Sequence, residues 1–172
     1  MLELVRPSIK RHTGRMAVVN AERINPEELA RPSGFSHAVS APAGRMVFLA
    51  GQIGMDRDGK VAGGGVVPQF EQALGNLLTA LAAAGGQPSD LVSLTIYLID
   101  VEDYQSHGRE IGAVWRRLTG TGYPAMAGVG VTRLWDPAAL VEIQGIAVVS
   151  PADAVPALDD VLHVGSRRFL EQ

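Results

Sequence analysis

The spacing of hydrophobic residues along the chain changes several times, and each change predicts a different element. Residues 36–41 (Ser-His-Ala-Val-Ser-Ala) and 45–50 (Arg-Met-Val-Phe-Leu-Ala) are short segments bounded by turn residues, which predicts two strands. Residues 42–44 (Pro-Ala-Gly) suit a tight turn, so we expect these strands to form a β-hairpin. A glycine-rich loop follows over residues 51–67.

Two helices are predicted after this loop, each from apolar residues at helical spacing. The first begins at Pro68, has Glu71 in its first turn and ends before Gly85. The second has Glu102 in its first turn and Gly120 just beyond its end. The apolar stripes are Phe70, Leu74, Leu77, Leu78 and Leu81 in the first helix, and Tyr104, Ile111, Trp115 and Leu118 in the second.

Three more strands complete the predicted order ββ-α-β-α-ββ, at residues 92–99, 125–133 and 140–149. Right-handed crossovers would place both helices on one face of a single mixed sheet, which defines an α+β fold. Several strands are apolar on both faces, as Met46 and Phe48 opposite Val47 and Leu49 illustrate. Because the helices cover only one face, we expect the other to be covered by further copies of the chain.

Length and charge narrow the function classes. The 172 residues fit one domain of about 150 residues with short extensions. We assign residues 1–17 to a basic N-terminal extension, 18–149 to the domain and 150–172 to a C-terminal extension. The net charge of −3 shows no cationic excess, so we expect no nucleic-acid partner. No apolar run is long enough to span a membrane, and the chain has no cysteine; we therefore expect a soluble, cytoplasmic protein.

No metal site or nucleotide motif is predicted. His12, His37, His107 and His163 are scattered without ligand-like spacing, so we interpret them as surface or packing residues. The Asp-Arg-Asp-Gly sequence at 56–59 lacks the remaining ligand positions of a calcium loop.

Three features carry candidate chemistry, and each has a plain structural alternative. Glu142 lies mid-strand among apolar residues, either at a solvated position or as a partly desolvated carboxylate that positions water or moves a proton. Gly128 and Gly130 on one strand indicate close approach of a ligand or of another subunit. Backbone donors after Gly51 form either a cradle for an anion or carbonyl, or an ordinary bend.

Four ordered segments together resemble the Rid family, also called YjgF, the reactive intermediate deaminases. The resemblance covers roughly residues 18–149 and rests on residues 33–39 (SGFSHAV), 48–54 (FLAGQIG), 72–77 (QALGNL) and 141–148 (VEIQGIAV). It implies a chorismate-mutase-like fold and a homotrimer whose sheets form a central barrel with three intersubunit clefts. It also implies hydrolysis of enamines and imines to 2-keto acids and ammonia, without a cofactor.

By this resemblance, Glu142 stands where typical members orient the attacking water, and Gly51 where a backbone group contacts substrate. The remaining positions depart from the pattern. Met126 stands in place of an arginine that binds the substrate carboxylate. Substrate-binding positions also differ at Phe35 in place of a tyrosine, Ala50 in place of a small hydroxyl residue, and Gly128 in place of a cysteine.

These departures lead to two hypotheses. A thioether cannot replace an arginine–carboxylate pair, so typical 2-imino acids are poor candidates unless Arg133, or Arg116 or Arg117 of another subunit, reaches the site. The first hypothesis is an imine or enamine hydrolase for another labile small molecule, with a neutral and more apolar pocket. The alternative is a non-catalytic homotrimer that binds a small ligand or a protein.

Overall fold

The computed structural model describes residues 21–149. The predicted extensions at 1–17 and 150–172 lie outside the described residues.

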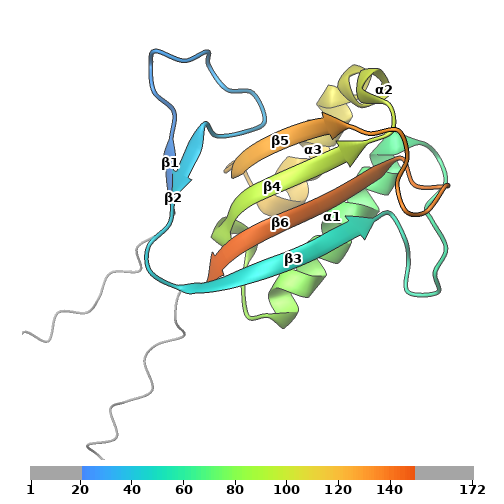
Figure 1. Ribbon diagram of the computed structural model, residues 1–172, viewed down its shortest axis with the longest axis horizontal. Coiled ribbons are helices and arrows are strands. Elements are labelled where there is room, and N and C mark those ends of the chain that lie inside the picture. The colour runs from blue at the N-terminus through green and yellow to red at the C-terminus, as the bar shows by residue number, and fades with distance from the viewer. Residues whose placement is uncertain (1–20, 150–172) are drawn as a thin grey trace, which may run out of the picture.

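A four-stranded mixed sheet forms the body of the fold (Figure 1). Its strands are, in order across the sheet, β3 (Arg45–Ile53), β6 (Val141–Val149), β4 (Leu91–Leu98) and β5 (Ala125–Gly130). β6 runs antiparallel to both neighbours, whereas β4 and β5 are parallel. A parallel pair needs a crossover, and here helices supply it.

The helices cover one face of this sheet, which lies in front of them in Figure 1. α1 (Val66–Ala83) packs on β3 and β6, and the crossover from β4 to β5 contains α2 (Val101–Ser106) and α3 (Gly108–Thr119). A single turn of 3-10 helix, η1 (Pro88–Asp90), precedes β4. The predicted placement of both helical segments on one face of a mixed sheet is confirmed.

Two details of the helix prediction were wrong. α1 begins at Val66, two residues before the predicted start, so Glu71 falls outside its first turn. The second predicted helix is divided at His107 into α2 and α3. The side chain of Asp100 accepts a hydrogen bond from the Asp103 N–H at 2.9 Å, which caps α2 one residue before its start.

The predicted hairpin between residues 36–41 and 45–50 was also wrong. β2 (Ala38–Ser40) pairs with β1 (Glu22–Ile24), and β3 pairs with β6. Turn residues allow the chain to reverse, but they do not choose the pairing partner. Gly44 instead passes close to β6, where a Cβ would come within 2.8 Å of the Val149 carbonyl oxygen.

The core lies between the sheet and the helices and follows the predicted stripes. Apolar residues of β3, β4, β6, α1 and α3 are buried there. The largest fully buried hydrophobic side chains include Phe70, Leu74, Leu77, Leu81, Leu91, Leu94, Leu98, Val141 and Ile143.

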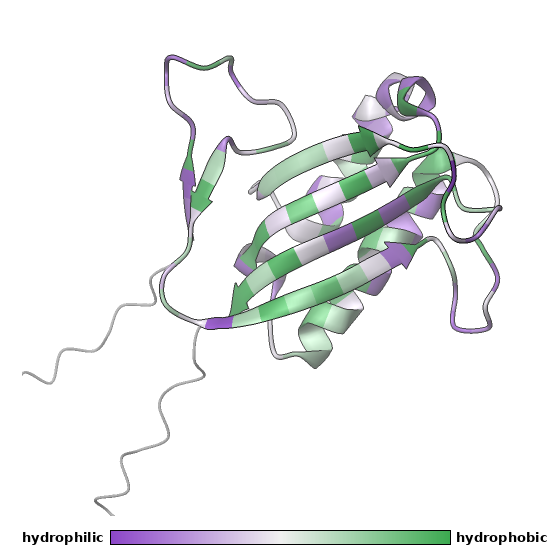
Figure 2. Cartoon of the chain, in the orientation of Figure 1, coloured by the Kyte–Doolittle hydropathy of each residue, from purple (hydrophilic) through white to green (hydrophobic). Residues whose placement is uncertain are grey.

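The opposite face of the sheet is uncovered in the single chain, as predicted. Phe48 is 73% exposed and Met46 is 55% exposed on this face. Figure 2 shows that hydrophobic and hydrophilic residues are mixed along the strands of the sheet. We call this surface the open face. Within residues 21–149, no helix combines the length and the hydropathy that a membrane crossing requires.

Candidate functional site

Glu142 lies on the open face near the end of the sheet where β3 ends. In β6 it is paired with Ile53 of β3 on one side and with Tyr97 of β4 on the other. Its side chain is half-buried within the single chain. The carboxylate is therefore held beside two strands without being removed from water.

Gly51 lies directly against this carboxylate. The pairing of β3 with β6 is irregular between Leu49 and Gln52, and this bulge carries Gly51 toward Glu142. A Cβ built at position 51 would overlap the Oε1 atom of Glu142. A carboxylate thus lies directly against a backbone position that carries no side chain.

A short polar row continues from Glu142 along the open face. Gln144 Nε2 donates a hydrogen bond to the Tyr97 hydroxyl oxygen at 2.8 Å. Thr95 lies opposite Gln144 in the register of β4 and β6. The open face is consequently apolar toward Phe48 and polar toward Glu142.

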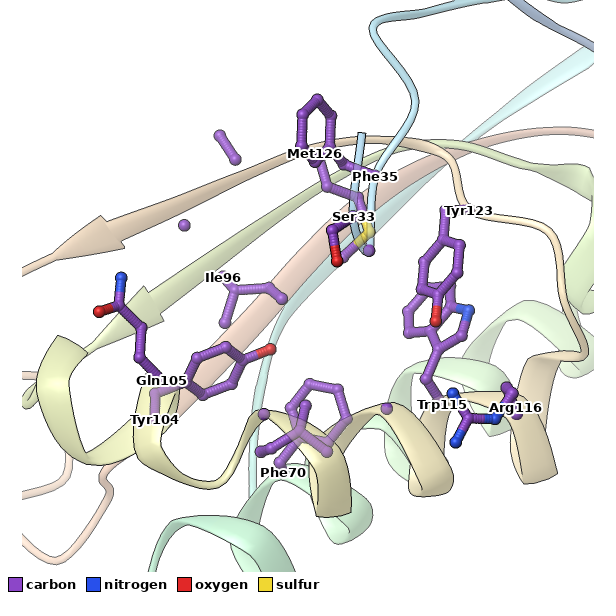
Figure 3. Close-up of a pocket in the computed structure, with 16 residues that line it drawn as sticks. Ser33, Phe35, Phe70, Ile96, Tyr104, Gln105, Trp115, Arg116, Tyr123 and Met126 are labelled. Carbon is purple, nitrogen blue, oxygen red and sulfur yellow. The ribbon is translucent and has the colours of Figure 1, made fainter. Parts of the chain in front are cut away.

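A pocket of about 490 Å³ lies on the helical side of the sheet, at the free edge of β5. Figure 3 shows Phe35 next to Met126 in this pocket, with Tyr104 and Trp115 among the residues that approach from the helices. Its lining residues are Ser33, Gly34, Phe35, Phe70, Ile96, Tyr104, Gln105, Gly108, Ile111, Gly112, Trp115, Arg116, Tyr123, Met126, Ala127 and Gly128. We call it the β5 pocket.

The segment that carries Phe35 is attached to the start of β5 by hydrogen bonds. The Ser36 N–H donates to the Pro124 carbonyl oxygen at 2.9 Å, and the Ser36 hydroxyl donates to the Tyr123 carbonyl oxygen at 2.7 Å. Arg23 Nε donates to the same Tyr123 oxygen at 3.0 Å. These bonds fix one wall of the β5 pocket.

Aromatic rings form much of the remaining wall. Trp115 and Tyr123 stack with their centroids 5.1 Å apart, and Phe70 meets Tyr104 edge to face at 5.9 Å. Burial raises the pKa of Tyr104 to about 12, with a smaller contribution from the neighbouring Tyr123. Tyr104 thus keeps its proton at neutral pH and offers a hydrogen-bond donor to the pocket.

The six predicted site residues fall into three groups in one chain. Gly51 and Glu142 lie together on the open face, and Phe35, Met126 and Gly128 lie together in the β5 pocket. Ala50 forms the third group by itself. It lines a hollow on the open face with Phe48, Ser93, Thr95, Gln144 and Ile146.

The sheet separates the first two groups. Met126 is paired with Leu94 and therefore shares the helical face, whereas Glu142 is paired with Tyr97 and shares the open face. Residues 94 and 97 point to opposite sides because side chains alternate along a strand. A single chain consequently does not bring Glu142 to the β5 pocket.

Arg116 is the functional candidate that sequence reasoning placed differently. The sequence analysis names Arg116 or Arg117 of another subunit, beside Arg133, as an exception that would supply a cation, whereas the structure places Arg116 in the lining of the β5 pocket of its own chain. Arg117 instead pairs with Glu71 at 3.0 Å, and Arg133 lines a separate hollow beside Trp135. The sequence carried a signal, because the pocket-lining residues Tyr104, Gly108, Gly112 and Arg116 recur at every fourth position.

The structure offers no obvious place for a metal ion. Among residues 21–149, no group of three or more histidine, cysteine, aspartate or glutamate side chains is close enough to hold one.

This mixed sheet, with two helical segments on one face and an edge pocket, defines an α+β class of protein with known relatives. The model of the Endoribonuclease L-PSP family matches residues 26–149. A Rid-family protein of unknown function from Yersinia pestis has a TM-score of 0.69 and 33% identity, covering 76% of this chain and 100% of that one. The chain belongs to the Rid family, and the predicted fold class is that of the family.

Two curated relatives extend this finding. A RutC family protein of Pyrococcus horikoshii is 34% identical over 128 residues, which cover 73% of this chain and 96% of that protein. A 2-iminobutanoate/2-iminopropanoate deaminase of Capra hircus is 34% identical over 108 residues, covering 62% of this chain and 75% of that protein. At the level of the family, these relatives support a Rid-type deaminase.

Proposed function

We propose that this protein is a cofactor-independent hydrolase that converts a labile imine or enamine into a carbonyl compound and ammonia. The observation that carries the proposal is the carboxylate of Glu142, held over the side-chain-free backbone of Gly51. A half-buried carboxylate near a backbone donor is suited to orient a water molecule and to accept its proton. The deaminase relatives described above support the same reaction type.

The proposed reaction balances with water as its only co-reactant. Glu142 accepts a proton from water while the water oxygen bonds to the imine carbon, and the C=N π electrons move to nitrogen. Glu142 then returns this proton to nitrogen, which gives a carbinolamine. The hydroxyl proton of the carbinolamine next moves to nitrogen by way of Glu142, the C–N bond breaks with its electrons going to nitrogen, and ammonia leaves as the carbonyl forms. An enamine first takes a proton on carbon to become the imine. The Gly51 N–H is the proposed backbone donor to the substrate.

We further propose that the complete site forms between copies of the chain. Glu142 and the β5 pocket lie on opposite faces of the sheet, so a second protomer is needed to bring them together. The exposed Phe48 and Met46 on the open face favour self-association. A homotrimer with three intersubunit clefts, in which Glu142 of one protomer faces the β5 pocket of the next, satisfies both observations.

The proposed substrate differs from the small 2-imino acids of typical members. Met126 presents a thioether in the β5 pocket, and a carboxylate bound against it alone would remain unpaired. Phe35 and Gly128 make the same pocket more apolar and more open, and Ala50 adds no hydroxyl group to the open face.

A non-catalytic role in binding a small ligand or a protein is the second candidate. Met126 favours it, because the position contacts the β5 pocket without a charged group. The two candidates differ in what they require of Glu142: hydrolysis depends on its carboxylate, whereas ligand binding does not.

The decisive experiment measures ammonia release from a panel of freshly generated imines. Glu142→Gln keeps the size of the side chain but removes the proton acceptor, so we expect it to lose most of the wild-type rate enhancement. Glu28→Gln makes the same chemical change at an exposed residue and is expected to retain the rate. Equal rates for wild type and Glu142→Gln would exclude the catalytic role and favour the binding protein.

A further inference from the structure

The β5 pocket contains a cation at a position that the family resemblance does not assign. Arg116 projects from α3 into the pocket lining, on the side of the helices, while Met126 lines the pocket from β5. Arg116 forms no ion pair with any residue in the described range, whereas the adjacent Arg117 is paired with Glu71. The pocket thus has a positive group, the guanidinium of Arg116, on the helix α3 and not on the strand β5, and this group is available to bind an anion.

The β5 pocket contains free space where two of its lining residues are glycines. A Cβ at Gly108 would meet no heavy atom within 4 Å, and one at Gly128 would meet only Leu98, at 4.0 Å. Both positions line the pocket. The absent side chains leave free space along the α2–α3 junction and along β5.

The walls of this space are aromatic. Phe35, Phe70, Trp115 and Tyr123 line it, and Figure 3 shows these rings distributed around the pocket. Rings of this kind favour flat apolar groups, with which they make stacked or edge-to-face contacts. An apolar group bound here would contact both the strand wall and the helix wall.

We propose that Arg116 determines specificity by binding the carboxylate of an imine or enamine that also carries a bulky aromatic or apolar side chain. This inference rests on the hydrolase function proposed above and names its substrate class. The carboxylate pairs with the guanidinium of Arg116, the Tyr104 hydroxyl donates a further hydrogen bond, and the side chain occupies the aromatic space.

The spacing of these groups explains the preference for a large substrate. With an arginine at position 126, a small 2-imino acid would find its carboxylate partner on the strand. In this chain the cation stands on α3, across the pocket from the strand residue Met126. A substrate that reaches Arg116 and also contacts Phe35 and Met126 must span the pocket, which a two- or three-carbon acid does not do.

Binding of stable ketones tests this inference without turnover. Phenylpyruvate carries both a carboxylate and an aromatic ring. Pyruvate carries the carboxylate without the ring, and phenylacetone carries the ring without the carboxylate. The affinity of the full chain for each compound is measured by calorimetry. We expect wild type to bind phenylpyruvate most tightly. Arg116→Gln should weaken phenylpyruvate at least about tenfold, the usual contribution of a charge-assisted hydrogen-bonded pair, and leave phenylacetone unchanged.

Two further variants separate charge from structure. Arg117→Gln changes the neighbouring arginine, which does not line the pocket, and should bind phenylpyruvate as wild type does. Arg116→Lys should restore part of the lost affinity, because it returns the charge without the planar fork. Arg116 is exposed, so its variants should unfold at the wild-type temperature.

The inference is overturned if Arg116→Gln binds phenylpyruvate as tightly as wild type, or if wild type binds pyruvate as tightly as phenylpyruvate. Failure of the hydrolase proposal gives a different result. In that case Glu142→Gln keeps the wild-type rate of ammonia release, while the Arg116 variants still decide how the carboxylate is bound.

Discussion

The carboxylate of Glu142 on β6 covers Gly51 on β3 so closely that a Cβ at position 51 would overlap its Oε1 atom. Two residues that are far apart in the sequence thus form one unit. The bulge in the pairing of β3 with β6, between Leu49 and Gln52, brings these two residues together.

Gly51→Ala is expected to abolish imine hydrolysis while preserving the fold. The new methyl group displaces the Glu142 side chain, whose far end is flexible enough to move without shifting the backbone. Ammonia release should fall to the level of Glu142→Gln, and the double variant should be no slower than either single one. Gly75→Ala is the control, because a Cβ there meets no heavy atom within 4 Å. Full activity of Gly51→Ala would contradict the proposed unit.

Met126→Arg is expected to create or raise turnover of small 2-imino acids. The new guanidinium would lie in the β5 pocket and bind a carboxylate in the bidentate manner. Since such a pair contributes about 1.5–3 kcal/mol, kcat/KM for the imine of pyruvate should rise tenfold or more. Met126→Gln has a similar length without the charge and should give no gain. No gain with Met126→Arg would mean that the pocket differs from typical members in more than this residue.

Phe48→Glu is expected to disrupt self-association. Phe48 is 73% exposed on the open face, and a charge there would have to be buried when copies of the chain cover it. Light scattering should report an oligomer for wild type and a monomer for the variant. Trp135→Glu changes an aromatic side chain that is 98% exposed in the loop between β5 and β6, and should remain oligomeric. A monomeric wild type would contradict the proposed trimer and with it the intersubunit site.

Gln69→Leu is expected to destabilise the fold by about 2–4 kcal/mol, because it leaves two backbone groups without their partner. The buried Gln69 amide donates to the Ala138 carbonyl oxygen at 3.0 Å and accepts from the Leu140 N–H at 2.7 Å. These bonds attach the loop before β6 to α1. Urea denaturation measures the loss. Thr79→Ala, at an exposed position of the same helix, should change the stability by less than about 0.5 kcal/mol.

The stability is expected to fall between pH 10 and pH 12 through Tyr104. Its pKa rises from the ordinary 10.0 to about 12 in the folded protein, chiefly by burial, so the folded state holds this proton more tightly than the unfolded state. The contribution is complete below pH 10, is lost as the pH rises through 12, and is on the order of 2 kcal/mol. Tyr104→Phe should flatten this part of the stability curve in denaturation at a series of pH values. An unchanged slope would contradict the assignment.

The elements that follow from local chemistry were predictable. The stripe that contains Phe70 and Leu74 predicted α1 because its spacing depends only on the helical repeat. The alternation along β6 likewise placed Glu142 on the face opposite the buried residues Val141 and Ile143. The family resemblance added the proposed roles of Glu142 and Met126.

The pairing of distant segments was not predictable from the same patterns. The turn residues 42–44 indicated a hairpin, but β3 pairs with β6, and there Leu49 joins the core with Val47 packed against it. The pattern also gave no reason to separate Glu142 from Met126. Their strands are not neighbours in the sheet, and only the register with β4 shows that they lie on opposite faces.

The sequence by itself therefore determined the four strands of the main sheet, α1, the placement of the helical segments on one face, and the family, but not β1 or the division between α2 and α3. Those properties arise from spacing and from motifs within short segments. The tertiary structure alone decided which residues share a site, because the β5 pocket is lined by both α3 and β5, and no local pattern specifies how these two elements are placed. That placement brings Arg116 of α3 into the same pocket as Met126 of β5.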